Sequence, residues 1–259
     1  MKYGWIDSHA HLMDDSLLLE IEEVIQRAKD NGLVRIMLIA LSKDEFDLAL
    51  RLKDKYPMLD IACGFHPSDA HSLNSQNWEK LEETLKTGKI TAIGEIGLDY
   101  YWDKSHMKTQ QEVFKRQLSL ADKYSLPVVI HMRDATQDTF DILEQANLIN
   151  KGVMHCYTGS VEMAKRFVSI GFLISLAGPL TFKNANENIE VAKSIDLGKL
   201  LIETDSPYLT PHPYRGKKNE SAYVRHVGEK LAEIKKTDVF TVQSQIYENY
   251  HRTFKSLKR

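Results

Sequence analysis

Residues 126–133 read LPVVIHMR, a short apolar run that follows a proline and ends in a histidine. Pro127 cannot continue the helical segment before it, and valine and isoleucine favour strands. A continuous apolar run bounded in this way is typical of a parallel strand that is covered on both faces. The sequence therefore predicts a buried parallel strand that ends at His131.

Seven more apolar runs of similar length lie on either side of this one, and longer segments with helical spacing separate them. The eight predicted strands are residues 3–9, 34–40, 60–65, 91–94, 127–131, 152–155, 172–176 and 199–203. The predicted helices are residues 17–31, 45–56, 78–87, 106–124, 136–146, 161–170 and 186–195, with two closing helices within 222–254. Eight strand–helix alternations predict an α/β fold, a (β/α)8 TIM-type barrel with C-terminal closing helices.

A doubly wound open sheet is the alternative architecture with the same alternation. No strand–helix turn of this chain carries the GxGxxG or Walker loop that nucleotide-binding members of that class use. The length of 259 residues suits one α/β barrel. No linker or low-complexity segment interrupts the pattern, and residues 209–219 read as a loop after the last strand. We therefore expect a single domain over residues 1–259.

Charge and composition exclude several classes of protein. The formal net charge of -2 lacks the basic excess of proteins that coat duplex DNA. Cys63 and Cys156 form no CxxC pair, so neither a disulfide framework nor a zinc ribbon is expected. The start MKYGWIDSHAH has no apolar run behind a basic head, and no stretch reaches the ~18 apolar residues of a membrane helix. We expect a soluble cytoplasmic protein.

Histidines and carboxylates stand at the ends of five predicted strands. Alternate residues of a strand share a face, so His9 and His11 point the same way. A lone histidine on an apolar run is more often a hydrogen-bonded core residue, and a buried glutamate can pair with a lysine. In a barrel, however, the carboxyl ends of the strands converge on one mouth. We therefore expect one metal site formed by His9, His11, Glu95, His131, His155 and Asp205.

The composition of this set narrows the choice of metal. Four imidazoles and two carboxylates suit Zn, Mn, Co, Ni or Mg ions better than Ca²⁺. Six ligands exceed one tetrahedral site and can hold two ions. The sequence therefore predicts two divalent metal ions whose identity it leaves open.

Motifs across nearly the whole chain carry a family resemblance. They are DSHAHL (7–12), GFHP (64–67), IGEIGLDYY (93–101), LPVVIHMR (126–133), HCYTG (155–159), ETDSPYL (203–209) and PYRGKKN (213–219). The chain resembles the TatD family of metal-dependent hydrolases and deoxyribonucleases, within the amidohydrolase superfamily. Two departures occur: Ser221 stands where the family often has proline, and Tyr157-Thr158 stands where it often has Phe-Ser. Neither departure touches an expected metal ligand.

The resemblance implies how the metal ligands are divided. It assigns His9, His11 and Asp205 to one ion and His131 and His155 to the other, with Glu95 as the bridge. It also implies a phosphodiester of DNA as substrate, attacked from the 3′ end.

The residues themselves indicate hydrolysis by a metal-activated water. Asp205, with Glu95 as the second expected catalytic carboxylate, could take the proton as general base. Arginine and lysine bind phosphate, and the further expected substrate contacts are His66, Arg133, Tyr157, Arg215 and Lys217. A solvated turn would explain the basic loop equally well, and a capping histidine would explain His66. Glu203 shares a face with Asp205 and is expected to support the ligands.

A narrow basic mouth on a nearly neutral protein favours DNA ends or short single-stranded DNA as the partner. We expect no membrane association and no obligate protein partner. Two alternatives stay open. One is an amidase, lactonase or esterase that acts on a small carbonyl substrate or on aminoacyl-RNA. The other is a non-enzymatic scaffold with a structural metal, although structural sites are usually closed and often use cysteine.

Overall fold

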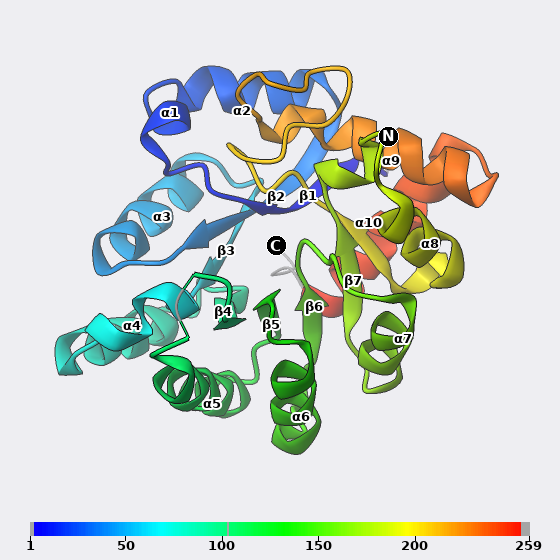
Figure 1. Cartoon of the computed structure of the whole chain (residues 1–259). Helices are drawn as coiled ribbons and strands as arrows, with labels where there is room; N and C mark the ends of the chain where they lie inside the picture. The colour runs from blue at the N-terminus through cyan, green and yellow to red at the C-terminus, as the bar shows by residue number, and fades with distance from the viewer. Residues whose placement is uncertain (1–2, 103, 255–259) are drawn as a thin grey trace. The chain divides into compact units, whose positions relative to one another are not determined.

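The computed structural model describes residues 3–102 and 104–254, in which strands and helices alternate along the chain (Figure 1). The strands form one sheet in the order β1 to β8, and the register of neighbouring strands is parallel. This is the strand order of a (β/α)8 barrel, so the predicted fold class is confirmed. The strands are β1 (Trp5–Ala10), β2 (Leu33–Ala40), β3 (Leu59–Cys63), β4 (Ala92–Asp99), β5 (Val128–Arg133), β6 (Gly152–Met154), β7 (Leu173–Leu176) and β8 (Leu200–Ile202).

The helices fill the intervals between strands and follow the last one. The α-helices are α1 (Asp15–Leu18), α2 (Ile21–Asp30), α3 (Lys43–Lys55), α4 (Ser75–Lys86), α5 (Met107–Lys123), α6 (Thr136–Ala146), α7 (Val161–Ser169), α8 (Asn186–Ser194), α9 (Val224–Lys235) and α10 (Val239–Phe254). The 3-10 helices are η1 (Pro67–Ser72), η2 (Gly178–Thr181), η3 (Leu197–Lys199) and η4 (Ser221–Tyr223). Among the described helices, none combines the length and apolarity that crossing a membrane requires.

Most element ends differ from the prediction by one to three residues, and two differences change the architecture. The helix expected over residues 17–31 is two helices, α1 and α2, because Glu20 leaves helical geometry with φ -121° and ψ 28°. The strand expected to end at Gly94 continues to Asp99. It continues because β5 runs on to Arg133 and pairs with it, Gly97 opposite His131 and Asp99 opposite Arg133. This extension places Asp99 on a strand rather than in a loop.

The chain contains two compact units, and each is described by itself. The first comprises residues 1–38 and 156–252. Here α9 lies against β1: a Cβ atom added to Gly228 would meet the Trp5 ring at 2.3 Å. In α10, the Asn249 side-chain amide donates to the carbonyls of Leu197 and Leu200 at 2.8 Å. The two closing helices therefore pack on β1 and on the start of β8.

The second unit runs from residue 39 to residue 155, with the end of α10. Two buried glutamines on α5 serve the carboxyl ends of its strands. The Gln117 side chain accepts from the Phe65 N–H at 2.8 Å and donates to its carbonyl at 3.1 Å. Gln110, two turns earlier on the same face, bonds both backbone groups of Asp99 at 2.9 Å. The two side-chain amides thus bond the backbone N–H and carbonyl groups of Phe65 and Asp99.

Candidate metal centre

The first unit brings two imidazoles and one carboxylate together. The His9 and His11 Nε2 atoms lie 3.1 Å apart, and Asp205 Oδ1 lies 3.6 Å and 3.4 Å from them. Zinc–nitrogen bonds of about 2.1 Å in a tetrahedron place ligand atoms about 3.4 Å apart. The spacing and the donor set therefore fit a divalent ion such as Zn²⁺. We call these three residues the first triad.

Backbone hydrogen bonds past the end of β8 place Asp205 beside β1. Its N–H donates to the His9 carbonyl at 3.0 Å, and the His11 N–H donates to the Ser206 carbonyl at 2.8 Å. Asp205 itself has φ 54°, in the left-handed region that non-glycine residues seldom occupy. Such a conformation persists only when the surrounding structure determines it, and it is common at functional sites.

A buried network that the sequence did not indicate secures the residue before Asp205. The Asp7 carboxylate accepts from the Thr204 N–H at 2.8 Å and from its hydroxyl at 2.6 Å. The Asn219 amide donates to the Thr204 carbonyl at 2.9 Å. Burial raises the pKa of Asp7 to about 7, although the bonds from Thr204 act to lower it. Asp7 and Asn219 thus fix the backbone from which the Asp205 side chain projects.

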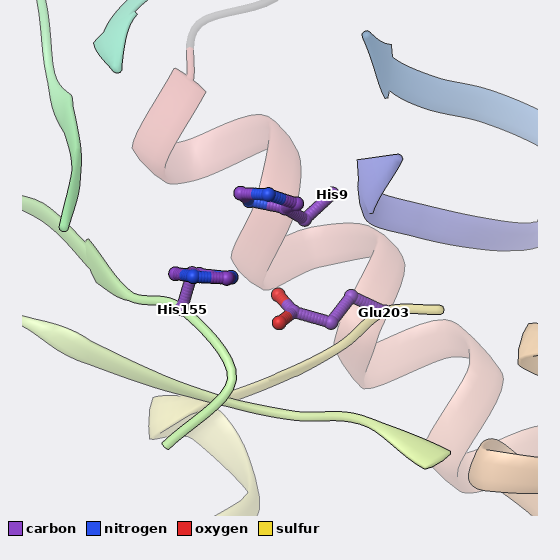
Figure 2. Close-up of side chains that lie close together, drawn as sticks. All are labelled: His9, His155 and Glu203. Atoms are coloured by element: carbon purple, nitrogen blue, oxygen red, sulfur yellow. The ribbon is translucent and has the colours of Figure 1, made fainter. Parts of the chain in front are cut away.

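Glu203 directly follows β8 and is fully buried. Figure 2 shows that its carboxylate and the His9 ring extend in the same direction from their backbones. Its Oε1 atom accepts from the Cys156 N–H at 2.6 Å, and Oε2 accepts from the Ser8 hydroxyl at 3.4 Å. Ser8 directly precedes His9. The contacts are of the kind expected for a residue that supports the metal ligands.

The second unit holds a second group of ligand atoms, which we call the second triad. Glu95 Oε1 lies 2.6 Å from His131 Nδ1 and 2.8 Å from His155 Nε2. The two imidazole nitrogens are 3.5 Å apart. Glu95 and His155 are buried, and burying a carboxylate is costly unless it is paired. A divalent ion between these atoms would satisfy all three groups.

Asp99 holds the other nitrogen of His131. Its Oδ2 atom lies 3.0 Å from His131 Nε2. Burial opposes the charged imidazolium, but the hydrogen bonds to Asp99 and Glu95 outweigh it and raise the pKa of His131. A carboxylate on the far nitrogen fixes the orientation of a histidine and leaves the near nitrogen for a metal. Asp99 is not among the predicted site residues, because the strand is expected to end at Gly94. The period-two spacing of Glu95, Gly97 and Asp99 is the signal in the sequence that could have found it.

His66 lies beside the second triad and also caps a helix. Its Nδ1 atom accepts from the Ser68 N–H at 3.2 Å at the start of η1, and Nε2 lies 3.8 Å from Glu95 Oε1. Burial lowers the pKa of His66 to about 4, which keeps the ring neutral at physiological pH. His66 is therefore a helix cap that also lies next to the second triad. Its contact with substrate stays a prediction.

The other residues expected to contact substrate differ in their exposure to solvent. Arg133 is exposed with its guanidinium 3.7 Å from the Tyr101 ring centre, and Arg215 is exposed over the Phe182 ring at 3.6 Å. Lys217 is exposed, 5.6 Å from the Tyr214 ring. Tyr157 is 2% exposed and its hydroxyl donates to the Ser160 carbonyl at 2.8 Å. The three cations are therefore free to meet a substrate from solvent, whereas Tyr157 is enclosed; all four substrate contacts stay predictions.

The family model described as TatD related DNase matches residues 6–255. The chain belongs to the TatD family. It is 42% identical over 251 residues to the Bacillus subtilis metal-dependent hydrolase YabD, covering 96% of this chain and 98% of that protein. The solved structure of YJJV, a TatD homologue from Escherichia coli, matches with a TM-score of 0.94 and 30% identity over 98% of this chain and 99% of that one. A TatD family hydrolase from Entamoeba histolytica matches with a TM-score of 0.87 and 25% identity, covering 98% and 99%.

TatD membership makes this chain a metal-dependent hydrolase, and therefore an enzyme rather than a scaffold. Both triads are groups of His, Glu and Asp side chains positioned to bind metal. The individual ligand assignments, the convergence of all six ligands on one site and the bridging role of Glu95 stay predictions.

Proposed function

We propose that this TatD-family hydrolase is a deoxyribonuclease that removes nucleotides from the 3′ ends of DNA or from short single strands. The observation that carries the proposal is the place of Arg133. It stands two residues beyond His131 on β5, so both side chains leave the same face of the strand, about 6.6 Å apart along it. A phosphate-binding cation next to a metal triad suits a phosphodiester better than a small neutral ester or lactone.

Each triad has the donor set for one divalent ion, and Zn, Mn, Co, Ni and Mg remain the candidates. When bound, such ions lower the pKa of water and stabilise negative charge on a phosphoryl oxygen. The chain's own residues would hold these ions: His9, His11 and Asp205 would hold one, and Glu95, His131 and His155 the other. Asp99 would keep His131 oriented through its hydrogen bond, and Glu203 would hold Ser8 and the Cys156 backbone, which are next to ligands in the sequence.

Asp205 is our candidate for the general base. Its carboxylate would accept a proton from the attacking water as the new phosphorus–oxygen bond forms. The bond from phosphorus to the 3′ oxygen of the shortened strand then breaks, and the same proton can pass to that oxygen. The reaction consumes one water and leaves Asp205 ionised for the next turnover.

A metal-exchange assay tests the proposed function. Protein treated with chelator and reloaded with one metal at a time is incubated with 3′-labelled single-stranded, duplex and circular DNA. We expect activity only with metal, loss of the 3′ label first, and faster cleavage of single-stranded ends than of circles. Hydrolysis of ester or lactone substrates with no cleavage of any oligonucleotide would favour the carbonyl alternative.

The cytoplasmic location and the lack of an obligate protein partner stay predictions from the sequence. Cell fractionation and the mass of the purified protein in solution would test them.

A further inference from the structure

Two exposed aromatic rings and an arginine form a cluster beside the second triad. Tyr101 and Trp102 follow the end of β4, and Arg133 is the last residue of the neighbouring β5. The Tyr100 N–H donates to the Arg133 carbonyl at 2.9 Å, so the strand pairing continues up to this cluster. The Arg133 guanidinium lies 3.7 Å from the Tyr101 ring centre and 5.3 Å from that of Trp102. The two rings meet edge to face at 4.8 Å.

The exposure of these rings indicates a ligand surface. Trp102 is 75% exposed and Tyr101 52%, whereas the other tryptophans, Trp5 and Trp78, are 4% and 8% exposed. Large aromatic surface left in water is unfavourable, and aromatic side chains gather where a partner covers them. Tyr101 occupies one face of the Arg133 guanidinium, which leaves its N–H edges for an anion. In the described part of the chain, no carboxylate forms an ion pair with Arg133.

We infer that Trp102 and Arg133 form a binding site for an unpaired nucleotide, in which Trp102 stacks on the base and Arg133 binds a phosphate. Every base offers a π-face to an aromatic ring, and arginine binds phosphate with paired N–H groups. A base inside a duplex has neighbours on both faces and must be unstacked, at a cost in free energy, before it can stack on Trp102. The site therefore selects frayed ends and single strands. This inference rests on the proposed function and names the feature of the substrate that is recognised.

Binding to metal-free protein tests the inference apart from catalysis. The probe is a 5′-labelled ten-residue oligothymidylate, compared with the same oligomer lacking its 3′-terminal bases but keeping every phosphate; fluorescence anisotropy gives each Kd in the presence of chelator. We expect Trp102→Ala to raise the Kd for the complete oligomer about tenfold, and Trp102→Phe, which keeps a ring, to raise it much less. The oligomer without terminal bases should bind wild type and Trp102→Ala equally. Because Trp102 is exposed, these variants should fold normally.

Arginine variants separate the phosphate contact from the base contact. Arg133→Ala should weaken the binding of both oligomers. The matched control is Arg116→Ala, which removes a guanidinium lying 3.8 Å from the Trp78 ring on α4 and should leave both Kd values unchanged. Equal effects of Trp102→Ala on both oligomers, or no effect on either, would overturn the inference. A protein that cleaves no DNA with any metal would instead refute the proposed function, and the chelated binding data would still decide the inference.

Discussion

At the scale of single residues, the expected metal ligands can be recognised in the sequence, whereas the residues that support them are recognised from contacts in the folded chain. His131 stands at the end of an apolar run, where its type and position mark it as a candidate. Asp99 supports it through a contact between neighbouring strands, 3.0 Å from His131 Nε2. The chemistry at each triad therefore depends on residues beyond the three that would touch an ion.

The general-base role predicts that Asp205→Asn loses at least a hundredfold in kcat while the first triad keeps its ion. An amide can still ligate a metal through oxygen, but it cannot accept the proton, and positioned acid–base groups contribute about 10²–10⁴-fold. Turnover and metal content are measured on the same preparation. Asp122→Asn, an exposed change on α5, is the control. A fully active, fully metallated Asp205→Asn protein would exclude the role.

The contact between Asp99 and His131 predicts that Asp99→Ala weakens binding of one ion about 10- to 100-fold, the usual effect of removing a carboxylate that orients a ligating histidine. Competition with a coloured chelator measures the two metal affinities separately. Asp99→Asn, which can still hydrogen-bond to the ring, should recover part of the loss. Unchanged affinity in Asp99→Ala would mean that packing alone orients His131.

At the scale of secondary-structure elements, α5 shows how a helix prepares the ends of strands for function. Its buried face carries Gln110 and Gln117, which bond the backbone of Asp99 and Phe65. A side-chain amide has both a donor and an acceptor, so it can bond the N–H and the carbonyl group of one residue. The segments that present Asp99 and His66 are therefore held by side chains of α5, in addition to the pairing of β4 with β5 at Asp99.

We expect Gln117→Ala to lower the free energy of unfolding by about 2–6 kcal/mol. It would leave the buried Phe65 N–H and carbonyl unsatisfied, and each such group costs about 1–3 kcal/mol. Urea unfolding followed by circular dichroism gives the value. Ser119→Ala, an exposed change on the same helix, should shift it by less than about 0.5 kcal/mol. Equal stability of the two variants would show that water replaces the amide.

At the scale of the whole molecule, the TatD fold encloses groups whose protonation is coupled to folding. Cys63, at the end of β3, is fully buried, and burial raises the pKa of its thiol well above its ordinary value of 9.0. The folded protein therefore holds the neutral thiol, and the unfolded chain releases its proton first. This contribution to stability is complete below pH 9 and is lost progressively as the pH rises above it.

Cys63 should consequently react with iodoacetamide only through unfolding, because the thiolate is the nucleophile. Mass spectrometry of peptides from native protein should show Cys156, which is partly exposed, modified before Cys63. A Cys63→Ala variant should lose less stability than wild type between pH 8 and about pH 10 in urea titrations. Rapid modification of Cys63 in native protein would show that β3 opens locally.

Much of the architecture could be read from local pattern. Helix α6 has the predicted bounds, Thr136–Ala146, and ends at Asn147, whose left-handed conformation terminates it. The helix end predicted at residue 31 is also within one residue, since α2 ends at Asp30 and Gly32 has φ 78°. Helix ends and apolar periodicity depend on neighbours within a few residues, which is why sequence alone could predict them.

The sequence by itself also determined which side chains can ligate metal, because residue type and place at a strand end are local facts. Only the tertiary structure decided which atoms meet: the extension of β4 to Asp99, the buried pairing of Asp7 with Thr204, and the enclosure of Tyr157. Such contacts join residues up to 197 positions apart. Their energies depend on packing and desolvation in the folded chain, and no local pattern of residues records them.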